Sequence, residues 1–500
     1  MGRKLPIFYS ALLLTGVNLL LRMVSTSFQV FLSGRIGAAG IGLLQLVLSV
    51  GALAMTAGMA GIRTATMYLC AEELGRKHPE NVRWVLSGCL LYSIVISGLL
   101  ASALYFFAPM IAEHWVGDSR TVDAIRLYSS FLPVTCLSGV MTGYFTAANR
   151  IGTLAAVEVV EQLLFMALTM TVLTLWADRD PAKACRAVIL GSGSGSCLTL
   201  LLLVFLRIRE KPAAAPSIPV AGRLMNTAVP LALADVLKSG ISTTENLMVP
   251  KRLALYPETA DPLAAFGTVC GMVFPVLMFP AAILFGLAEL LIPELARCAA
   301  AGSRLRIRYL AMRSLRIGLL YSCLVCGLEF LLAESLCLRL YGNPEAALWL
   351  RRFSLLIPML YCDAITDAMT KGLGQQKVCV RYNILTSFLD VVFLFLLLPK
   401  YGMAGYYFSF LITHLINFLL SLRRLLKLTG KIMSIRFCLF TPVSAGIGIL
   451  LCRIISHPLP AAFGFLGVFA AQLTLSGCLK KEDLLWLKRL ATGGINPGNG

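Results

Sequence analysis

Three positively charged side chains stand inside long apolar stretches of the sequence. Arg22 lies near the middle of the first apolar run, Arg63 lies within the second, and Lys238 lies midway along the seventh. A charged side chain at the centre of a bilayer costs about 2.5–3.5 kcal/mol on insertion scales, so it normally faces a cavity or a partner. Because guanidinium groups donate paired hydrogen bonds to phosphate, we predict that these three side chains line a water-filled cavity and bind an anionic headgroup.

Two of these cations also have a simpler interpretation. Arg63 lies near the inner end of its run, from which a long side chain could reach the membrane surface. Lys238 could pair with Asp235, which lies three residues earlier on the same helix face. Glu245 lies two turns beyond Lys238. A carboxylate at membrane depth is a candidate for proton or cation binding, which makes Asp235 and Glu245 the candidate ion-coupling residues.

The composition places the chain in a membrane. Of its 500 residues, 58% are hydrophobic and only 14% are charged, whereas about 25% of a soluble protein's residues are charged. The net charge of +19 falls mostly in short loops between apolar runs, and the sequence offers no basic soluble domain, which argues against a nucleic-acid partner. The first apolar run, about residues 7–31, is too long for a signal-peptide core, so we expect it to be a span.

The apolar runs predict an all-α polytopic membrane protein with about fourteen transmembrane helices. The first two spans are expected at about residues 7–33 and 41–70. Alternate loops carry about twice as many Lys and Arg residues as the others, and this bias predicts that both termini are cytoplasmic. The expected location is therefore the cytoplasmic membrane.

An internal repeat predicts how the spans are organised. A shift of 225 residues places Gly117 on Gly342, Ser129 on Ser354 and Gly42 on Gly267. An offset of six spans keeps both copies in the same orientation, which predicts two six-helix lobes related by a pseudo-two-fold axis along the membrane normal, with a site between them. The expected divisions are an N-terminal lobe (residues 1–206), a cytoplasmic linker (207–223), a C-terminal lobe (224–430), two additional spans (431–479) and a cytoplasmic tail (480–500).

The sequence favours transport over catalysis. We find no persuasive nucleophile–base pair and no cofactor fingerprint, so we expect neither an enzyme nor a bound cofactor. The spacing Cys323-x-x-Cys326 lies within an apolar run and has no second ligand pair nearby, so we expect no metal site. Acids near helix ends, such as Glu158, Glu161 and Asp363, are interpreted as satisfied polar groups between helices.

The opening of the chain resembles a known family. Asn18-Leu-Leu-Leu-Arg22, Ile36-Gly-Ala-Ala-Gly-Ile-Gly42 and Gly61-Ile-Arg63, together with Pro250-Lys-Arg-Leu253, are similar to the corresponding parts of polysaccharide-biosynthesis flippases. These belong to the multidrug/oligosaccharidyl-lipid/polysaccharide exporter superfamily, and the likeness to its sporulation-protein branch covers nearly the whole chain. The overall architecture carries most of the resemblance.

The resemblance implies a flippase that moves a lipid-linked oligosaccharide by alternating access. The implied cargo is an undecaprenyl-pyrophosphate-linked peptidoglycan or cell-wall precursor, with spore cortex formation as the implied setting. The implied partners are this substrate, membrane lipids and a coupling H⁺ or Na⁺. In related lipid II flippases, arginines on the first two helices contact the headgroup, and the resemblance implies this role for Arg22 and Arg63. Those flippases also place an acid near the start of the second helix, where Gly40-Ile-Gly42 stands here, so their coupling scheme does not carry over.

Two other functions compete with this interpretation. A cation-coupled multidrug exporter would need an acidic, aromatic-rich cavity, and the mid-membrane Arg22 and Lys238 argue against it. A membrane-embedded glycan polymerase or ligase would normally need a large catalytic loop outside the membrane. The longest outer loops expected here are only about ten to fifteen residues long.

Overall fold

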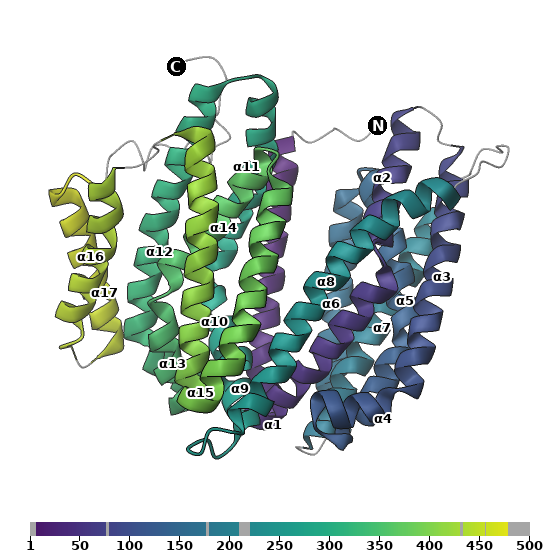
Figure 1. The fold of residues 1–500 in the computed structure, drawn as a ribbon, viewed down its shortest axis with the longest axis horizontal. Helices are drawn as coiled ribbons and strands as arrows, with labels where there is room; N and C mark the ends of the chain where they lie inside the picture. The colour runs from purple at the N-terminus through teal and green to yellow at the C-terminus, as the bar shows by residue number, and fades with distance from the viewer. Residues whose placement is uncertain are drawn as a thin grey trace. The chain divides into compact units, whose positions relative to one another are not determined.

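The computed structural model describes residues 7–76, 80–176, 180–209, 221–430, 434–455 and 457–478, and the regular structure within these ranges is entirely helical (Figure 1). In the described residues, nine helices are long and apolar enough to cross a membrane, or ten if the bent pair Pro262–Met278 and Ala281–Ala300 forms one span. The expected all-helical, multi-pass membrane fold is confirmed, while the count of fourteen spans stays a prediction.

Two very long helices are each a pair of helices joined at a glycine. Helix α1 (Ile7–Met59) is non-helical at Gly37, with φ 69° and ψ 178°. Helix α15 (Gln376–Thr429) is non-helical at Gly402, with φ 56° and ψ −140°. Positive φ is accessible to glycine at little cost because it has no Cβ. Both breaks therefore occur at glycines.

A further break interrupts the second expected span. Ala60 and Gly61 have φ values of 42° and 69°, and they separate α1 from α2 (Ile62–Gly75). Arg63 falls in the first turn of the new helix. The expected continuous span over residues 41–70 is thus two helices, because two consecutive left-handed residues cannot continue an α-helix.

The chain forms two compact units. One unit contains residues 31–267 and 394–402. Its core packs α2, α3, α5 and α7 against one another around Ile62, Val85 and Phe145, and α8 packs on α2 and α3. Besides α2 and the second half of α1, its elements are α3 (Val82–Phe106), α4 (Ala108–Met110), the turns Ile111–Val116 and Ser119–Thr121, α5 (Val122–Ala147), α6 (Ile151–Trp176), α7 (Pro181–Ile208), α8 (Ala221–Leu253) and α9 (Pro262–Gly267).

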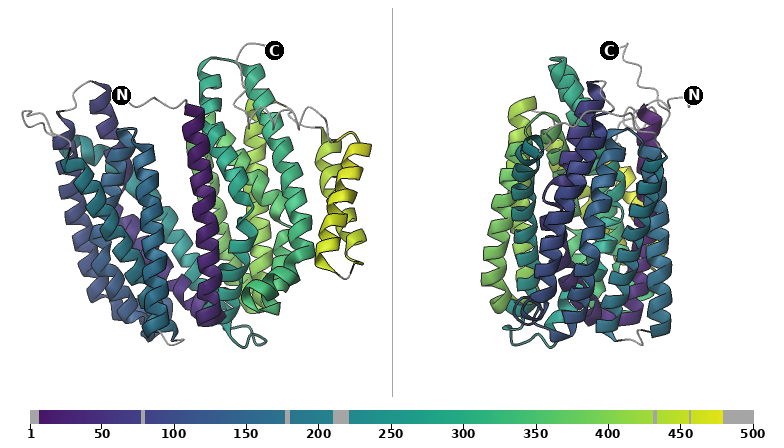
Figure 2. Two further views of the ribbon diagram at one scale, coloured as in Figure 1. Left: turned by 180° about the vertical axis from the view of Figure 1, so that it is seen from behind. Right: turned by 90° about the vertical axis from the view of Figure 1, so that its right-hand side faces the viewer.

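The other unit contains residues 1–30, 268–393 and 403–500. Figure 2 shows the first half of α1 running beside helices of this unit, where Gln29 donates a hydrogen bond of 3.1 Å to the carbonyl of Gly271. Helices α16 and α17 pack on α12 (Figure 1). Its further elements are the turn Thr268–Val273, α10 (Phe274–Met278), α11 (Ala281–Ala300), α12 (Arg304–Tyr341), α13 (Pro344–Ser354), α14 (Ile357–Gly372), most of α15, α16 (Ile435–Cys452) and α17 (Pro458–Leu475).

This grouping differs from the lobes expected at residues 1–206 and 224–430. Helix α8 groups with the first unit because it packs on α2 and α3, and the first half of α1 groups with the second. The expected linker lies largely outside the described residues, as does the tail at 480–500. The grouping by contacts does not test the expected symmetry, so the symmetric lobes stay a prediction.

Locally, however, the two copies of the repeat share their geometry. Gly117 and Gly342 both end a helical segment with positive φ, of 84° and 62°. The residues that follow, Asp118 and Asn343, each cap the next helical turn by accepting a hydrogen bond from the backbone N–H two residues on, at 2.9 Å in both cases. The 225-residue offset thus reproduces one loop-to-helix motif twice.

Candidate functional site

A pocket of about 420 Å³ brings together three of the charged residues that the sequence selected. Arg63 contributes from the start of α2, and Asp235 and Lys238 contribute from α8. The remaining lining is small or weakly polar and comes from the end of α1, the break after it, α2 and α8: Met55, Thr56, Met59, Gly61, Thr64, Ser239 and Ser242. The pocket lies wholly within the unit that contains residues 31–267.

Two local features place these side chains. The break at Ala60–Gly61 puts Arg63 in the first turn of α2 at the pocket wall. Helix α8 is held to α1 by two hydrogen bonds to Ser49. The Thr243 hydroxyl donates to its backbone carbonyl, and the Asn246 amide donates to its hydroxyl, both at 3.0 Å. These bonds fix α8 on α1 one to two turns from Lys238.

The charges that line the pocket are available to a ligand. Arg63, Lys238 and Asp235 are all exposed. Within the described part of the chain, Lys238 and Asp235 form no ion pair with each other, so the local pairing proposed as the simpler interpretation is not seen. Arg63 acts electrostatically on Glu158 of α6. Two cations and one carboxylate on a partly polar wall can bind an anion through charge-assisted hydrogen bonds.

Arg22 has different surroundings. It lies on the first half of α1, in the unit that also contains residues 268–393, and its side chain is half-buried. Its guanidinium carbon lies 5.5 Å from the ring centroid of Phe285 on α11, which is a cation–π distance. Among the described residues it makes no ion pair with a carboxylate. Arg22 does not line the pocket that holds Arg63 and Lys238.

Glu245, the other candidate for ion coupling, also lies on α8. Its side chain is half-buried and already has an interaction partner. It does not belong to the lining of the pocket, whereas Asp235 does.

The sequence reasoning missed two acids that lie deep inside helices. Asp390 on α15 accepts hydrogen bonds from the hydroxyls of Ser409 at 2.6 Å and Thr413 at 3.2 Å. Glu329 on α12 is 5% exposed. A signal was present for both, because each is a single acid within an otherwise apolar run.

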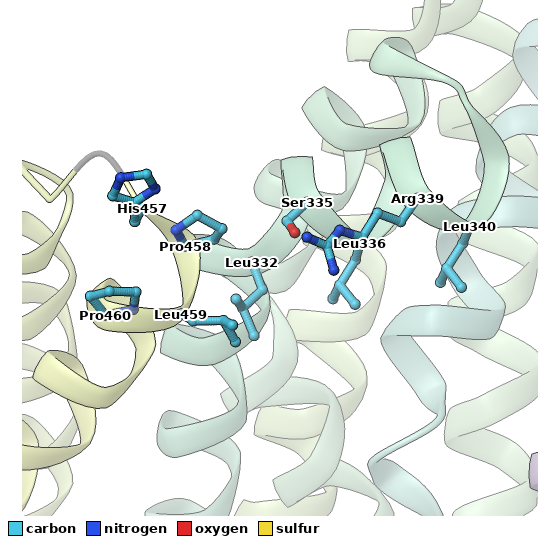
Figure 3. Close-up of a pocket in the computed structure, with 9 residues that line it drawn as sticks. All are labelled: Leu332, Ser335, Leu336, Arg339, Leu340, His457, Pro458, Leu459 and Pro460. Atoms are coloured by element: carbon cyan, nitrogen blue, oxygen red, sulfur yellow. The ribbon is translucent and has the colours of Figure 1, made fainter.

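A second pocket, of about 560 Å³, lies between α12 and α17 (Figure 3). Its walls are mainly leucine and proline side chains, and Arg339, Ser335 and His457 are its polar members. No residue selected from the sequence lies in it.

Comparison with known proteins identifies the fold. The family described as MatE matches residues 15–178. Stage V sporulation protein B of Bacillus subtilis (strain 168) is 22% identical over 406 residues, which cover 79% of this chain and 78% of the relative. The solved structure of the lipid II flippase MurJ in an inward closed conformation aligns with a TM-score of 0.66 and 12% identity over 94% of this chain and 98% of its own. The chain has the fold of the MOP-superfamily transporters.

An inward-facing multidrug resistance MATE family transporter of that superfamily also aligns, with a TM-score of 0.64 and 15% identity over 83% of this chain and 99% of the transporter. The expected resemblance to MOP-superfamily exporters, including the stage V sporulation protein B type, is therefore confirmed. The aligned structures thus include a lipid II flippase and a multidrug transporter.

Proposed function

We propose that this protein is a flippase that moves an anionic, lipid-linked oligosaccharide across the cytoplasmic membrane by alternating access. The cargo would be a pyrophosphate-linked peptidoglycan or cell-wall precursor, and the setting could be spore cortex formation. The observation that carries the proposal is the pocket that Arg63 and Lys238 share. Both termini would lie in the cytoplasm.

The composition of the pocket supports an anionic headgroup. Arg63 and Lys238 are exposed at its wall, and Asp235 is the one acid in its lining. Two cations against one carboxylate leave an excess of positive charge for a diphosphate. Arginine and lysine have complementary uses here, because the guanidinium binds phosphate through a rigid fork and the ammonium acts as a compact point charge.

Arg22 is proposed as a second contact for the headgroup. Its guanidinium forms no ion pair with a carboxylate among the described residues. Its contact with the face of the Phe285 ring is a cation–π contact, which uses no hydrogen-bond donor. Asp235 and Glu245 remain the proposed sites for a coupling H⁺ or Na⁺.

The multidrug alternative predicts a different dependence on these residues. A cationic drug would be repelled by Arg63 and Lys238, so their removal should leave drug export unchanged or increase it. For an anionic headgroup, losing one charge-assisted hydrogen bond costs about 1.5–3 kcal/mol, which corresponds to roughly a 10–100-fold loss of affinity.

Translocation of a labelled undecaprenyl-pyrophosphate-linked precursor in proteoliposomes tests the proposal. The native chain should translocate it, and Arg63→Ala and Lys238→Ala should reduce the rate at limiting substrate by about tenfold or more. Arg22→Ala should also reduce it. Arg83→Ala is the matched control, because Arg83 is an exposed cation on α3 that does not line the pocket.

Two results would contradict the proposal. The first is a native chain that is folded but does not move the precursor under any ion gradient. The second is equal transport by the native chain and both pocket variants, which would remove the pocket from the headgroup site.

A further inference from the structure

A buried stripe on α12 contains one acid among small side chains. Ser322, Cys326, Glu329, Ala333 and Cys337 recur at helical spacing and are each no more than 5% exposed. Both carboxyl oxygens of Glu329 are shielded from solvent and have no hydrogen-bond partner among the described residues. Glu329 thus lies buried within α12, and the described residues give it no hydrogen-bond donor.

Other deep acids in the described chain differ from Glu329 in this respect. Glu161 accepts a hydrogen bond of 2.7 Å from the Thr199 hydroxyl, and Asp363 accepts one of 2.9 Å from the Asn417 amide. Each has a donor on a neighbouring helix to offset the cost of burial. Glu329 has no such donor among the described residues, although it is more deeply buried than either.

The groups around Glu329 offer it no positive charge. Those in electrostatic range are Tyr321, Cys326 and Cys337 on α12 and Tyr361 on α14. Helix α17 presents Phe465, which is fully buried against Gly327.

The remaining charged groups of the neighbouring helices lie elsewhere. Arg351 on α13 pairs at 2.9 Å with Glu334, whose side chain is 62% exposed. Arg22 of α1 stacks on Phe285 of α11 and is in electrostatic range of Tyr361. Among the described residues, no cation forms an ion pair with Glu329.

The nearby tyrosines also have their hydroxyls engaged. Tyr361 donates a hydrogen bond of 2.7 Å to the carbonyl of Leu277, and Tyr321 donates one of 2.9 Å to the carbonyl of Pro280. These carbonyls flank the break between α10 and α11. Both hydroxyls thus brace that break and do not solvate Glu329.

An ionised carboxylate in such a position would be very unfavourable, so the group is expected to take up a proton. The fold does not require an acid here. At the equivalent position of the repeat, 225 residues earlier, Leu104 on α3 is 7% exposed. An apolar residue therefore fills the corresponding place, and the acid at Glu329 needs another explanation.

We propose that Glu329 is a proton-binding site, that its carboxyl is protonated when α12 and α14 pack as in this structure, and that it releases the proton when this packing opens. The neutral acid fits the dry stripe, whereas the ionised acid requires water. Proton release is thereby coupled to separation of the helices that brace the α10–α11 break. The coupling to transport rests on the proposed function, but proton binding does not.

Infrared spectroscopy of the full chain in lipid nanodiscs tests proton binding directly. A protonated carboxyl has a C=O stretch that an ionised carboxylate lacks. The native protein at neutral pH should show this band, and Glu329→Gln and Glu329→Leu should each lose one carboxyl's intensity. Glu329→Leu copies the repeat partner, so it guards against a folding defect. Glu334→Gln, at the exposed acid on the same helix, should leave the band unchanged. Equal bands in the native chain and both Glu329 variants would overturn the proposal.

Hydrogen exchange tests the coupling to packing. Protection of residues 319–341 and 357–372 is compared between the native chain and Glu329→Gln at pH 6 and at pH 8. Comparison at the same pH cancels the intrinsic dependence of exchange on pH. Protection of the native chain should fall relative to the variant at the higher pH. A ratio that does not change with pH would overturn the release step. Neither measurement uses a transported substrate, so failure of the flippase assay would remain distinct from failure of this site.

Discussion

Gly42 and Gly267, which the 225-residue repeat pairs with each other, lie in direct contact. A Cβ added to Gly267 would lie 2.6 Å from the backbone nitrogen of Gly42 and 2.0 Å from the carbonyl oxygen of Ala38. A Cβ added to Gly42 would lie 2.3 Å from the carbonyl oxygen of Leu263. The fold thus brings into contact the two positions that the 225-residue offset pairs.

Substitution of either glycine should be strongly destabilising. In Gly267→Ala and Gly42→Ala the new methyl group meets rigid backbone atoms that cannot move aside. Overpacking of this kind costs about 1–3 kcal/mol or more, and it should lower the midpoint of thermal unfolding measured in detergent. Gly98→Ala on α3 is the control, because a Cβ there meets no atom within 4 Å. It should be neutral or stabilising by up to about 1 kcal/mol. Equal effects at all three glycines would show that the close approach is unimportant.

Arg252 replaces a helical hydrogen bond that Pro399 removes. Proline has no N–H, so the carbonyl of Phe395, four residues earlier, loses its normal partner. The Arg252 guanidinium donates to this carbonyl at 2.8 Å and 3.2 Å and lies 3.6 Å from the Phe395 ring centroid. Arg252→Ala should therefore lower stability by about 1–3 kcal/mol.

A double-mutant cycle separates this role from general loss of charge. Pro399→Ala restores an N–H for the Phe395 carbonyl, so the cost of Arg252→Ala should be smaller in that background. The measurement is the thermal unfolding midpoint of the four proteins. Strictly additive effects would mean that Arg252 acts without this carbonyl.

Arg223 joins the start of α8 to the end of α2. Its guanidinium donates to Glu73 and to Glu72, both at 2.7 Å, and the Glu73 side chain is only 3% exposed. Arg223→Ala should leave Glu73 with the Asn81 amide as a remaining donor, at a cost of about 1–3 kcal/mol.

Restoring charge balance should recover part of this loss. Arg223→Ala combined with Glu73→Gln should unfold at a higher temperature than Arg223→Ala alone, because no carboxylate is then left buried. Arg351→Ala breaks the exposed pair with Glu334 and should cost less than about 1 kcal/mol. A cost at Arg223 as small as that at Arg351 would contradict the prediction.

Asp118 should contribute to stability in a pH-dependent way. The side chain of Arg120 donates to its carboxylate at 2.6 Å and holds the pKa of Asp118 below its usual range. The contribution is therefore fully present above the ordinary aspartate pKa of about 3.9, and it is lost as pH falls through the lower folded value.

Asp118→Asn isolates the charge because it keeps the capping oxygen, as Asn343 does in the repeat. The native chain should be more stable than Asp118→Asn by about 0.5–1 kcal/mol near pH 6. The difference should shrink as pH falls below the ordinary aspartate pKa of about 3.9 and should disappear below the lower folded value. Thermal unfolding across this range checks the prediction, and a difference that does not vary with pH would refute it.

The amino-acid sequence by itself determined the membrane class and the helical architecture. Long apolar runs can satisfy their backbone groups in lipid only as helices, and Gly37 and Gly402 mark places where positive φ is accessible. The offset of 225 residues likewise paired Gly117 with Gly342, and the structure adds that the residues after them, Asp118 and Asn343, cap the next helical turn. All of these follow from local chemistry, which can be inferred from the sequence without knowing which segments contact each other in the fold.

Only the tertiary structure decided which charged residues share an environment. The break at Ala60–Gly61 and the bonds from α8 to Ser49 bring Arg63 and Lys238 to one pocket, whereas Arg22 stacks on Phe285. The isolation of Glu329 depends equally on which side chains of α12, α14 and α17 surround it. Helical periodicity places a residue on a face, but the partner of that face is set by packing between segments far apart in the chain.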